Sequence, residues 1–236
     1  MSKSPFPGFP KEGLSFLDDL AANNHKTWFE AHKKDYERLL RDPALEFIVA
    51  LGERLKTISK GVHYDTRANG SGSLMRIYRD TRFSADKTPY KTNISMMFWE
   101  GEGKKMQHPG FGIQIQSHEA GMMAGMFGFD KTQLEAYRQA VIDNKLGKEL
   151  VKAIEAVKSV NGFDVSGEQF KRVPAGYDAD HPRANLLLYN GLHAYSPRIP
   201  PDVITSPEIV DVCFEYCRIM SPIQQWLAKV EGMAMT

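Results

Sequence analysis

The chain has 236 residues, of which 42% are hydrophobic, and its 30 basic and 29 acidic residues leave a formal net charge of +1. A chain of this length lies near the upper range for one domain and can bury a sizeable core without disulfides or metals. The balanced charge gives no general attraction to nucleic acid or anionic membranes, and no run of about 18 apolar residues predicts a membrane helix. We therefore expect one cytoplasmic, soluble domain spanning residues 1–236, with neither a membrane nor nucleic acid as partner.

Apolar residues at helical spacing open the chain and predict three amphipathic helices. The first contains Leu14, Leu17 and Leu20, the second Trp28, Phe29, Tyr36 and Leu39, and the third Phe47, Ile48, Leu51, Leu55 and Ile58. Asn23 and Asn24 separate the first two helices, and Asp42 before Pro43 is typical of an N-cap that starts the third. Charged residues follow Trp28 and Phe29 on the opposite helical face, which predicts that both aromatic rings are buried.

The hydrophobic pattern changes from helical to alternating after the Gly/Ser-rich turn at residues 69–73. Four strands are predicted, at residues 74–80, 93–100, 111–117 and 122–127. Short turns between the later strands favour antiparallel neighbours, because parallel strands need long crossover connections.

Further helices are predicted after these strands. Asp130 and Gln133 have the spacing of a capping box, and a second apolar helix follows through Leu146 and Val157. Another helix is predicted from Pro182 to Asn190, and a last one from a cap at Ser206 toward Trp226. The order of helices, strands and helices predicts an α+β fold, with an antiparallel sheet of about four or more strands, roughly at 74–127, covered by helices from both ends of the chain.

Residues 76–91 concentrate charge, with five basic and two acidic side chains interleaved with aromatic ones. Arginine and lysine donate hydrogen bonds to carboxylate or phosphate groups, and aromatic rings shield such a site from water. Since two carboxylates cannot neutralise five cations, the excess favours a small anionic or phosphorylated ligand. The predicted ligand-binding residues are Arg76, Tyr78, Arg79, Asp80, Arg82, Asp86, Lys87, Tyr90 and Lys91.

Other interpretations of this segment remain open. The same side chains fit an internal network of ion pairs in a non-catalytic structural or protein-interaction domain, with acidic residues distant in sequence supplying the balance. A solvated surface loop and a site for single-stranded nucleic acid are further alternatives. Asp80, Asp86 and Lys87 faintly resemble the set of a metal-dependent nuclease, although their spacing is not the usual one.

A second polar cluster consists of Asp178, Asp180 and His181, whose side chains are able to bind a metal or transfer protons. Capping of the helix predicted at Pro182 accounts for them more simply. We therefore predict no metal site. The sequence identifies no catalytic residue, cofactor, reaction or protein partner.

The pattern Arg-x-Tyr-Arg-Asp-x-Arg-Phe-Ser-x-Asp-Lys-x-Pro-Tyr-Lys at residues 76–91 resembles a conserved family of bacterial and fungal proteins, the domain of unknown function DUF2461. The resemblance also rests on Pro7, Gly8 and Phe9, on Asn23 and Asn24, on Trp28 and Phe29, on Gly176, Tyr177 and Asp178, and on His181 and Pro182. It spans nearly the whole chain and supports a single domain. It implies no activity.

Overall fold

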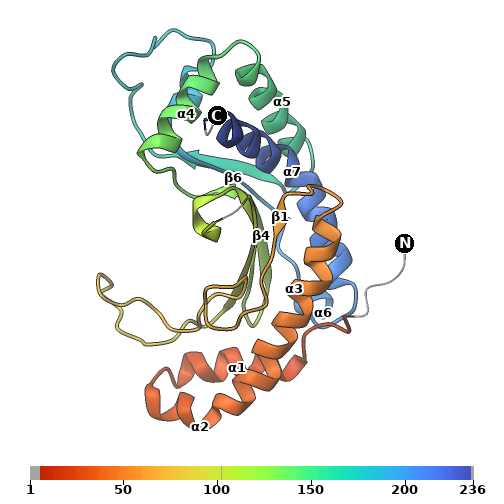
Figure 1. Cartoon of the computed structure of the whole chain (residues 1–236). Helices are drawn as coiled ribbons and strands as arrows, with labels where there is room; N and C mark the ends of the chain where they lie inside the picture. Colours follow the sequence, from red (N-terminus) through yellow and green to blue (C-terminus); the bar gives the residue numbers. More distant parts are fainter. Residues whose placement is uncertain (1–5, 102, 235–236) are drawn as a thin grey trace. The chain divides into compact units, whose positions relative to one another are not determined.

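The computed structural model describes residues 6–101 and 103–234 (Figure 1). The chain forms two compact units, each built from separate segments. Unit 1 consists of Met1–Phe98, Gly112–Met122 and Arg198–Glu215, and unit 2 consists of Trp99–Phe111, Met123–Pro197 and Tyr216–Thr236. That these units form one domain stays a prediction.

In the part of the chain that the structure describes, the strands form a six-stranded antiparallel sheet in the order β1-β2-β3-β4-β6-β5. They are β1 (Val62–His63), β2 (Ile94–Glu100), β3 (Gly110–Ile115), β4 (Ala120–Met126), β5 (Asp164–Glu168) and β6 (Tyr189–Tyr195). Together with the helices, this sheet confirms the α+β fold. It also confirms three of the four predicted strands, as β2, β3 and β4, whereas β1, β5 and β6 were not predicted.

The remaining prediction, a strand at residues 74–80, is wrong, because no continuous strand forms there. This segment is extended but joins its neighbours only through isolated bridges, from Leu74 to Met96 and from Tyr78 to Tyr90. In one antiparallel register, the two residue numbers of every pair have the same sum. The sums of these two pairs differ, so the pairing register shifts between the two bridges. A shift of this kind interrupts the ladder of hydrogen bonds although the alternation of side chains persists.

Unit 1 contains α1 (Lys11–Ala22), α2 (Lys26–Tyr36) and α3 (Asp42–Leu55), coloured red to orange in Figure 1, which confirm the three predicted N-terminal helices. The prediction that Asp42 is the N-cap of the third helix is wrong, because a π-helical turn, η1 (Glu37–Arg41), joins α2 to α3. Asp42 has helical backbone angles and donates its N–H to the carbonyl of Glu37. This wider turn carries the helix up to Pro43, which has no N–H to donate.

Only one of the two aromatic residues at the start of α2 is fully buried. Phe29 is 1% exposed, whereas Trp28 lies partly at the surface and stacks on His32 with ring centroids 4.1 Å apart. Successive residues of a helix point in directions about 100° apart, so neighbours cannot both face the centre of the core. The prediction that both rings are buried is therefore correct for Phe29 and wrong for Trp28.

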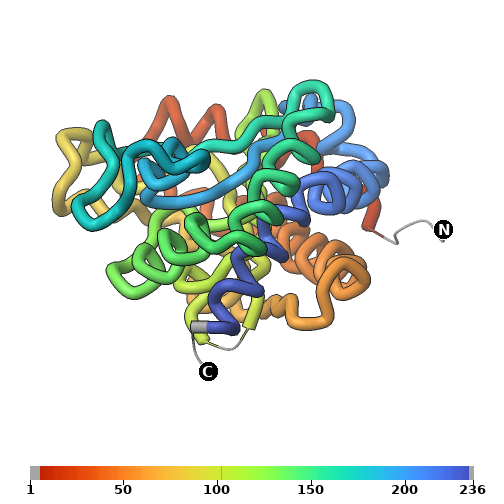
Figure 2. Tube along the Cα trace, turned by 90° about the horizontal axis from the view of Figure 1, so that it is seen from above, coloured from red at the N-terminus to blue at the C-terminus, as the bar shows by residue number. Residues whose placement is uncertain are grey.

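In unit 2, α4 (Lys131–Ile142) begins with the predicted capping box, in which Asp130 and Gln133 bond to each other's backbone. The helix α5 (Leu146–Lys158) packs against α4 and β5, and Figure 2 shows the path of the chain through these elements in green and teal. The buried side chain of Arg183 bonds to the carbonyl groups at the C-terminal end of α4. Its Nε donates to the carbonyl of Val141 at 2.7 Å, and its Nη2 donates to the carbonyls of Ile142 and Asp143 at 3.2 and 3.1 Å. These bonds satisfy carbonyls that the helix itself leaves unpaired.

The helix predicted from Pro182 to Asn190 is wrong. After Pro182 the chain makes a short 3-10 turn, η3 (Ala184–Leu188), and then enters β6. Cross-strand pairing on both sides, with β4 and β5, outweighs the weak helical pattern of this apolar run. The final helices are α6 (Pro201–Ile204) and α7 (Ile209–Ala234), and α7 continues through Pro222. The hydroxyl of Ser206, the predicted cap, accepts the N–H of Glu208 just before α7.

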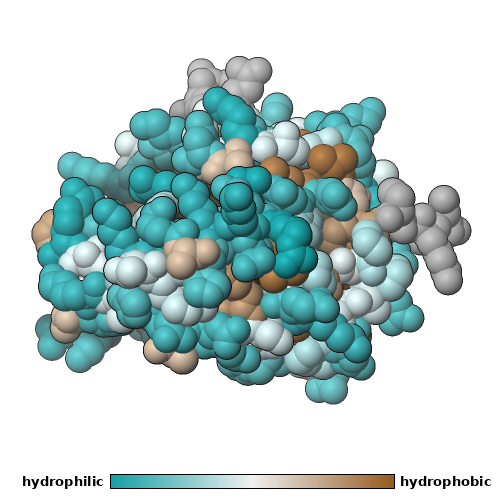
Figure 3. All heavy atoms as spheres, turned by 90° about the horizontal axis from the view of Figure 1, so that it is seen from below, coloured by the Kyte–Doolittle hydropathy of each residue, from teal (hydrophilic) through white to brown (hydrophobic). Residues whose placement is uncertain are grey.

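The surface in view in Figure 3 is mostly hydrophilic, with small hydrophobic patches between polar side chains. Within residues 6–101 and 103–234, no helix has the length and apolar character needed to cross a membrane.

Candidate anion site on the hairpin of residues 76–91

Residues 76–91 form a hairpin in unit 1, with its tip at residues 80–88. The N–H of Arg79 donates to the carbonyl of Pro89 at 2.9 Å, and the N–H of Lys91 donates to the carbonyl of Ile77 at 2.8 Å. Ile77 is buried, whereas Arg76 and Tyr78 are exposed. The predicted alternation of a half-buried strand therefore holds here, although no continuous strand forms.

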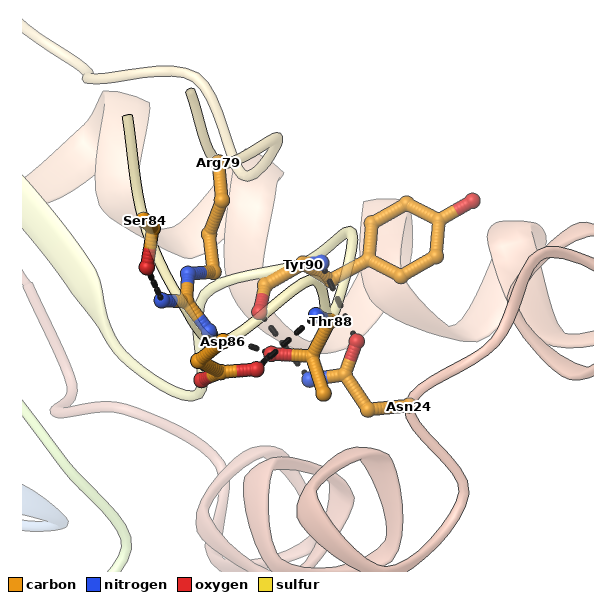
Figure 4. A network of polar contacts seen from close by, with 6 residues as sticks. All are labelled: Asn24, Arg79, Ser84, Asp86, Thr88 and Tyr90. Atoms are coloured by element: carbon orange, nitrogen blue, oxygen red, sulfur yellow. Dashed lines mark hydrogen bonds and ion pairs between the residues drawn. The ribbon is translucent and has the colours of Figure 1, made fainter. Parts of the chain in front are cut away.

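Asn24 holds the base of this hairpin. The two hydrogen bonds described above flank the pair Tyr78 and Tyr90, so the backbone groups of Tyr90 point away from Tyr78. Asn24 satisfies both of them: its Nδ2 donates to the carbonyl of Tyr90 and its Oδ1 accepts the N–H of Tyr90, each at 3.0 Å (Figure 4). Because Asn24 lies between α1 and α2, these bonds attach the hairpin to the helices.

Aromatic rings of the hairpin pack on aromatic rings of α2. The ring of Tyr90 stacks on Phe29 with centroids 4.1 Å apart, and Tyr78 lies 5.3 Å from Tyr90. Tyr36 contacts the other side of this cluster, 5.5 Å from Phe29. Burial raises the pKa of Tyr36 to about 12 and also raises the pKa of Tyr90. These phenols therefore stay neutral at physiological pH, and the rings form an aromatic floor at the base of the hairpin.

Two of the five cations are neutralised inside the hairpin. Arg79 contacts Asp86 and Thr88, and its Nη2 lies 3.5 Å from the hydroxyl of Ser84 (Figure 4). Arg82 forms two hydrogen bonds with Asp80, at 2.9 and 2.7 Å.

These contacts lower the pKa of both carboxyl groups to about 2, chiefly through Arg82 for Asp80 and through Arg79 for Asp86. A third cation, Lys87, donates to the backbone carbonyl of Thr81 at 2.9 Å. The tip of the hairpin is thus a local network that uses both of its carboxylates.

Arg76 and Lys91 are left without an acidic partner: among the residues that the structure describes, neither side chain forms a hydrogen bond or an ion pair. The pKa of Lys91 is lowered, first by partial burial and then by the charge of Arg76, which places the two cations near each other. The aliphatic part of Arg76 packs so closely on Gly70 that a side chain on Gly70 would collide with it. The turn at residues 69–73 therefore helps to fix the direction of Arg76.

The remaining polar candidates act within their own loops. The carboxylate of Asp178 accepts the N–H of Asp180 at 2.9 Å, and Nδ1 of His181 accepts the N–H of Arg183 at 3.2 Å. Both contacts close backbone turns ahead of η3. The predicted capping of a helix at Pro182 is wrong, because that helix is absent. Asp80, Asp86 and Lys87, the set compared with a nuclease, are held by the contacts within the hairpin. No group of three His, Cys, Asp or Glu side chains in the described part of the chain is placed to hold a metal ion.

Sequence reasoning missed Asn24 as part of this site. Asn23 and Asn24 stood out only as a separator of helices and as part of the family resemblance, and nothing local indicates that Asn24 bonds to a residue 66 positions away. It also missed Phe29 and Tyr36 as the apolar floor of the site, because their periodicity indicates only that they belong to a core.

No curated protein matches the chain at a significant level. The model of a family described as conserved hypothetical protein (DUF2461) matches residues 12–226, a range that includes Asn24, the aromatic floor and the whole hairpin. The match covers nearly the entire chain and confirms the resemblance seen in the pattern at residues 76–91. The chain belongs to the DUF2461 family of conserved hypothetical proteins.

Proposed function

We propose that the hairpin binds a small anionic or phosphorylated ligand and that Arg76 and Lys91 are its main charged contacts. The observation that supports this is the uneven pairing of the five cations: Arg79 and Arg82 each have a carboxylate, and Arg76 and Lys91 have none in the described structure. Two neighbouring cations repel each other, and partial burial adds a desolvation cost. A bound carboxylate or phosphate offsets both effects, because its negative charge pairs with the two cations.

The other predicted residues have supporting roles in this proposal. The pairs Arg79 with Asp86 and Arg82 with Asp80 keep the tip in its conformation, and Lys87 reinforces it through a backbone carbonyl. Tyr78 is half exposed beside Arg76, so its hydroxyl is available to orient a ligand, whereas buried Tyr90 belongs to the floor. We assign no catalytic step and no cofactor to this site.

A protein-interaction role is the second candidate, and a specific observation favours it. Phe83 at the tip of the hairpin is 96% exposed, with the guanidinium of Arg82 5.8 Å from its ring centroid. A fully exposed aromatic ring next to a cation is typical of a contact residue in a protein interface. In this reading the two Arg and Asp pairs are purely structural.

Thermal melting with inorganic phosphate or sulfate separates these roles. The comparison uses the wild type, Arg76→Gln, Lys91→Gln, and Arg82→Gln as a control that removes the same charge from the same hairpin. We expect phosphate to raise the melting temperature of the wild type and of Arg82→Gln but not of the other two variants, since a ligand at a hundred times its Kd adds about 2.7 kcal/mol. Without anion, Arg76→Gln should be as stable as the wild type or more so, because it leaves no carboxylate unpaired.

Two results would count against the anion site. If neither phosphate, sulfate nor a panel of phosphorylated metabolites stabilises the wild type, the binding proposal is rejected. If all three variants lose the anion effect equally, the effect reflects general charge and not a site at Arg76 and Lys91. A loss of binding to a protein partner in Phe83→Ala alone would favour the second candidate.

A further inference from the structure

A separate group of side chains lies in unit 2, on one face of β6. His193 and Tyr195 are two positions apart and share this face, whereas Leu192 and Ala194 point to the opposite, fully buried face. The cross-strand partners of His193 are Gly125 on β4 and Ser166 on β5. Little side-chain volume therefore stands beside the imidazole on either neighbouring strand.

Gly125 is required at its position. Its φ of +119° is strained for any residue with a side chain, and an added Cβ would collide with the backbone of Leu192. The absence of a side chain opposite His193 on β4 is therefore required by the backbone at Gly125.

Two exposed aromatic rings flank this imidazole. Phe127 lies 5.0 Å and Tyr195 4.9 Å from the ring centroid of His193, and the two outer rings are 6.5 Å apart. Phe127 is 57% and Tyr195 is 39% exposed, whereas His193 is only 7% exposed. A nearly buried polar ring thus lies between two apolar surfaces that are open to solvent.

The hydrogen bond of His193 fixes which nitrogen carries its proton. Nδ1 lies 3.2 Å from the carbonyl of Met126, and because a carbonyl only accepts, Nδ1 must donate. Burial lowers the pKa of His193, so the ring is neutral and Nε2 keeps its lone pair. Across residues 6–101 and 103–234, Nε2 has no hydrogen-bond partner. Nε2 is not among the enclosed side-chain atoms of the described structure, so its lone pair is accessible to a donor from outside the chain.

We propose that Phe127, His193 and Tyr195 bind a neutral planar aromatic ring that stacks on the exposed rings and donates an N–H hydrogen bond to Nε2 of His193. The cross-strand neighbours of these residues on β4, Met123 and Gly125, carry no charge. Asp164, opposite Tyr195 on β5, is already paired with Lys158 at 3.1 Å. The ligand is therefore a nitrogen heterocycle and not a charged group, in contrast to the ligand proposed for the hairpin.

The test compares indole with N-methylindole, which has nearly the same ring but lacks the N–H. Indole, titrated to millimolar concentration into isotope-labelled protein, should shift the Nε2 resonance of His193 and the backbone amides of β4 and β6, and N-methylindole should bind more weakly. Phe127→Ala and Tyr195→Leu should weaken binding by about fivefold to a hundredfold, the effect of losing one stacked ring. Phe83→Ala, which removes an exposed Phe in unit 1, is the matched control and should bind indole like the wild type.

His193→Phe keeps an aromatic ring and removes the acceptor, so it should abolish the preference for indole over N-methylindole. Because His193 is buried, the melting curve of His193→Phe must first show that this variant folds. If it does not fold, Phe127→Ala, at an exposed position, tests the site independently. Equal affinity for the two probes in the wild type, unchanged binding by Phe127→Ala, or no binding of indole would each overturn the proposal. Adenosine in a parallel titration shows whether a nucleobase satisfies the same site.

Discussion

The carboxylate of Asp86 accepts hydrogen bonds from Arg79 and from both the N–H and the hydroxyl of Thr88. These bonds lower its pKa to about 2 in the folded protein, below the ordinary value of about 3.9. The group therefore stabilises the fold above pH about 4, and this contribution is lost as the pH falls through about 2. We predict that Asp86→Asn is less stable than the wild type at neutral pH and loses less stability on acidification over this range. Denaturant unfolding at each pH measures this, and an Asp86 carboxyl that titrates at its ordinary pKa in NMR would contradict it.

Phe29 and Trp28 provide a comparison within one helical turn. We predict that Phe29→Ala lowers the free energy of unfolding by about 3 to 5 kcal/mol, because the ring is buried and stacks on Tyr90. Trp28→Ala should cost clearly less, since its ring is partly exposed. Urea unfolding of both variants tests the difference. Equal losses would show that Trp28 contributes as much to the core as Phe29 does.

At this scale the sequence reveals how much charge the site has but not how it is distributed. The excess of cations at residues 76–91 is evident from composition, and the pair Arg82 with Asp80 is only two residues apart. Which cations stay unpaired depends on the register of the hairpin and on the tip conformation, and these come from the fold. The neutral tautomer of His193 likewise depends on a carbonyl 67 residues away.

Among the elements, the hairpin depends on Asn24 for its attachment. We predict that Asn24→Ala destabilises the protein by about 1 to 3 kcal/mol, because it leaves the N–H and the carbonyl of Tyr90 without partners. Hydrogen exchange should accelerate at the Tyr90 amide. The control is Asn23→Ala, which removes an adjacent amide that bonds only to the Asp19 carbonyl one helical turn away. Slow exchange at Tyr90 in Asn24→Ala would show that other contacts hold the hairpin.

The junction of α4 and α5 depends on a glycine. An added Cβ at Gly147 would collide with the carbonyl of Val141 and with Nε of Arg183, the two groups whose bond ends α4. We predict that Gly147→Ala is destabilising and lowers the melting temperature. Gly232→Ala in α7 is the matched control: no described atom lies within 4 Å of the added Cβ, and alanine favours a helix over glycine by about 1 kcal/mol. A neutral Gly147→Ala would show that Arg183 moves aside at no cost.

Elements with strong local signals were predictable. The three N-terminal helices follow from repeated apolar spacing, and α4 follows from its capping box. The strand β6 was not predictable because its apolar residues fit either period, and its pairing partners β4 and β5 lie far from it in sequence. The π-helical turn before Pro43 was also hidden, since a proline after Asp42 normally indicates a helix start.

For the whole molecule, we predict a single cooperative unfolding transition. Four of the five boundaries between unit 1 and unit 2 fall inside β2, β3, β4 and α7, so unfolding one unit alone would break these elements and their backbone hydrogen bonds. Trp28 lies in unit 1, and Trp99 and Trp226 lie in unit 2. Fluorotryptophan labelling follows all three rings by NMR in the unmutated protein during urea denaturation. Different midpoints for Trp28 and Trp226 would show that the units unfold separately.

Because Asn24 recognises Tyr90 only through backbone atoms, the attachment of the hairpin does not depend on which side chains its tip carries. Replacing residues 80–88 in this chain should therefore leave the loop departing from the helices at the same point. The side-chain amide of Asn24 bonds to the backbone of Tyr90 as a neighbouring strand would, and it holds the base of the loop independently of the tip. Foreign peptides inserted at residues 80–88 should be presented from a fixed base, which makes this position a natural place for grafting binding sequences.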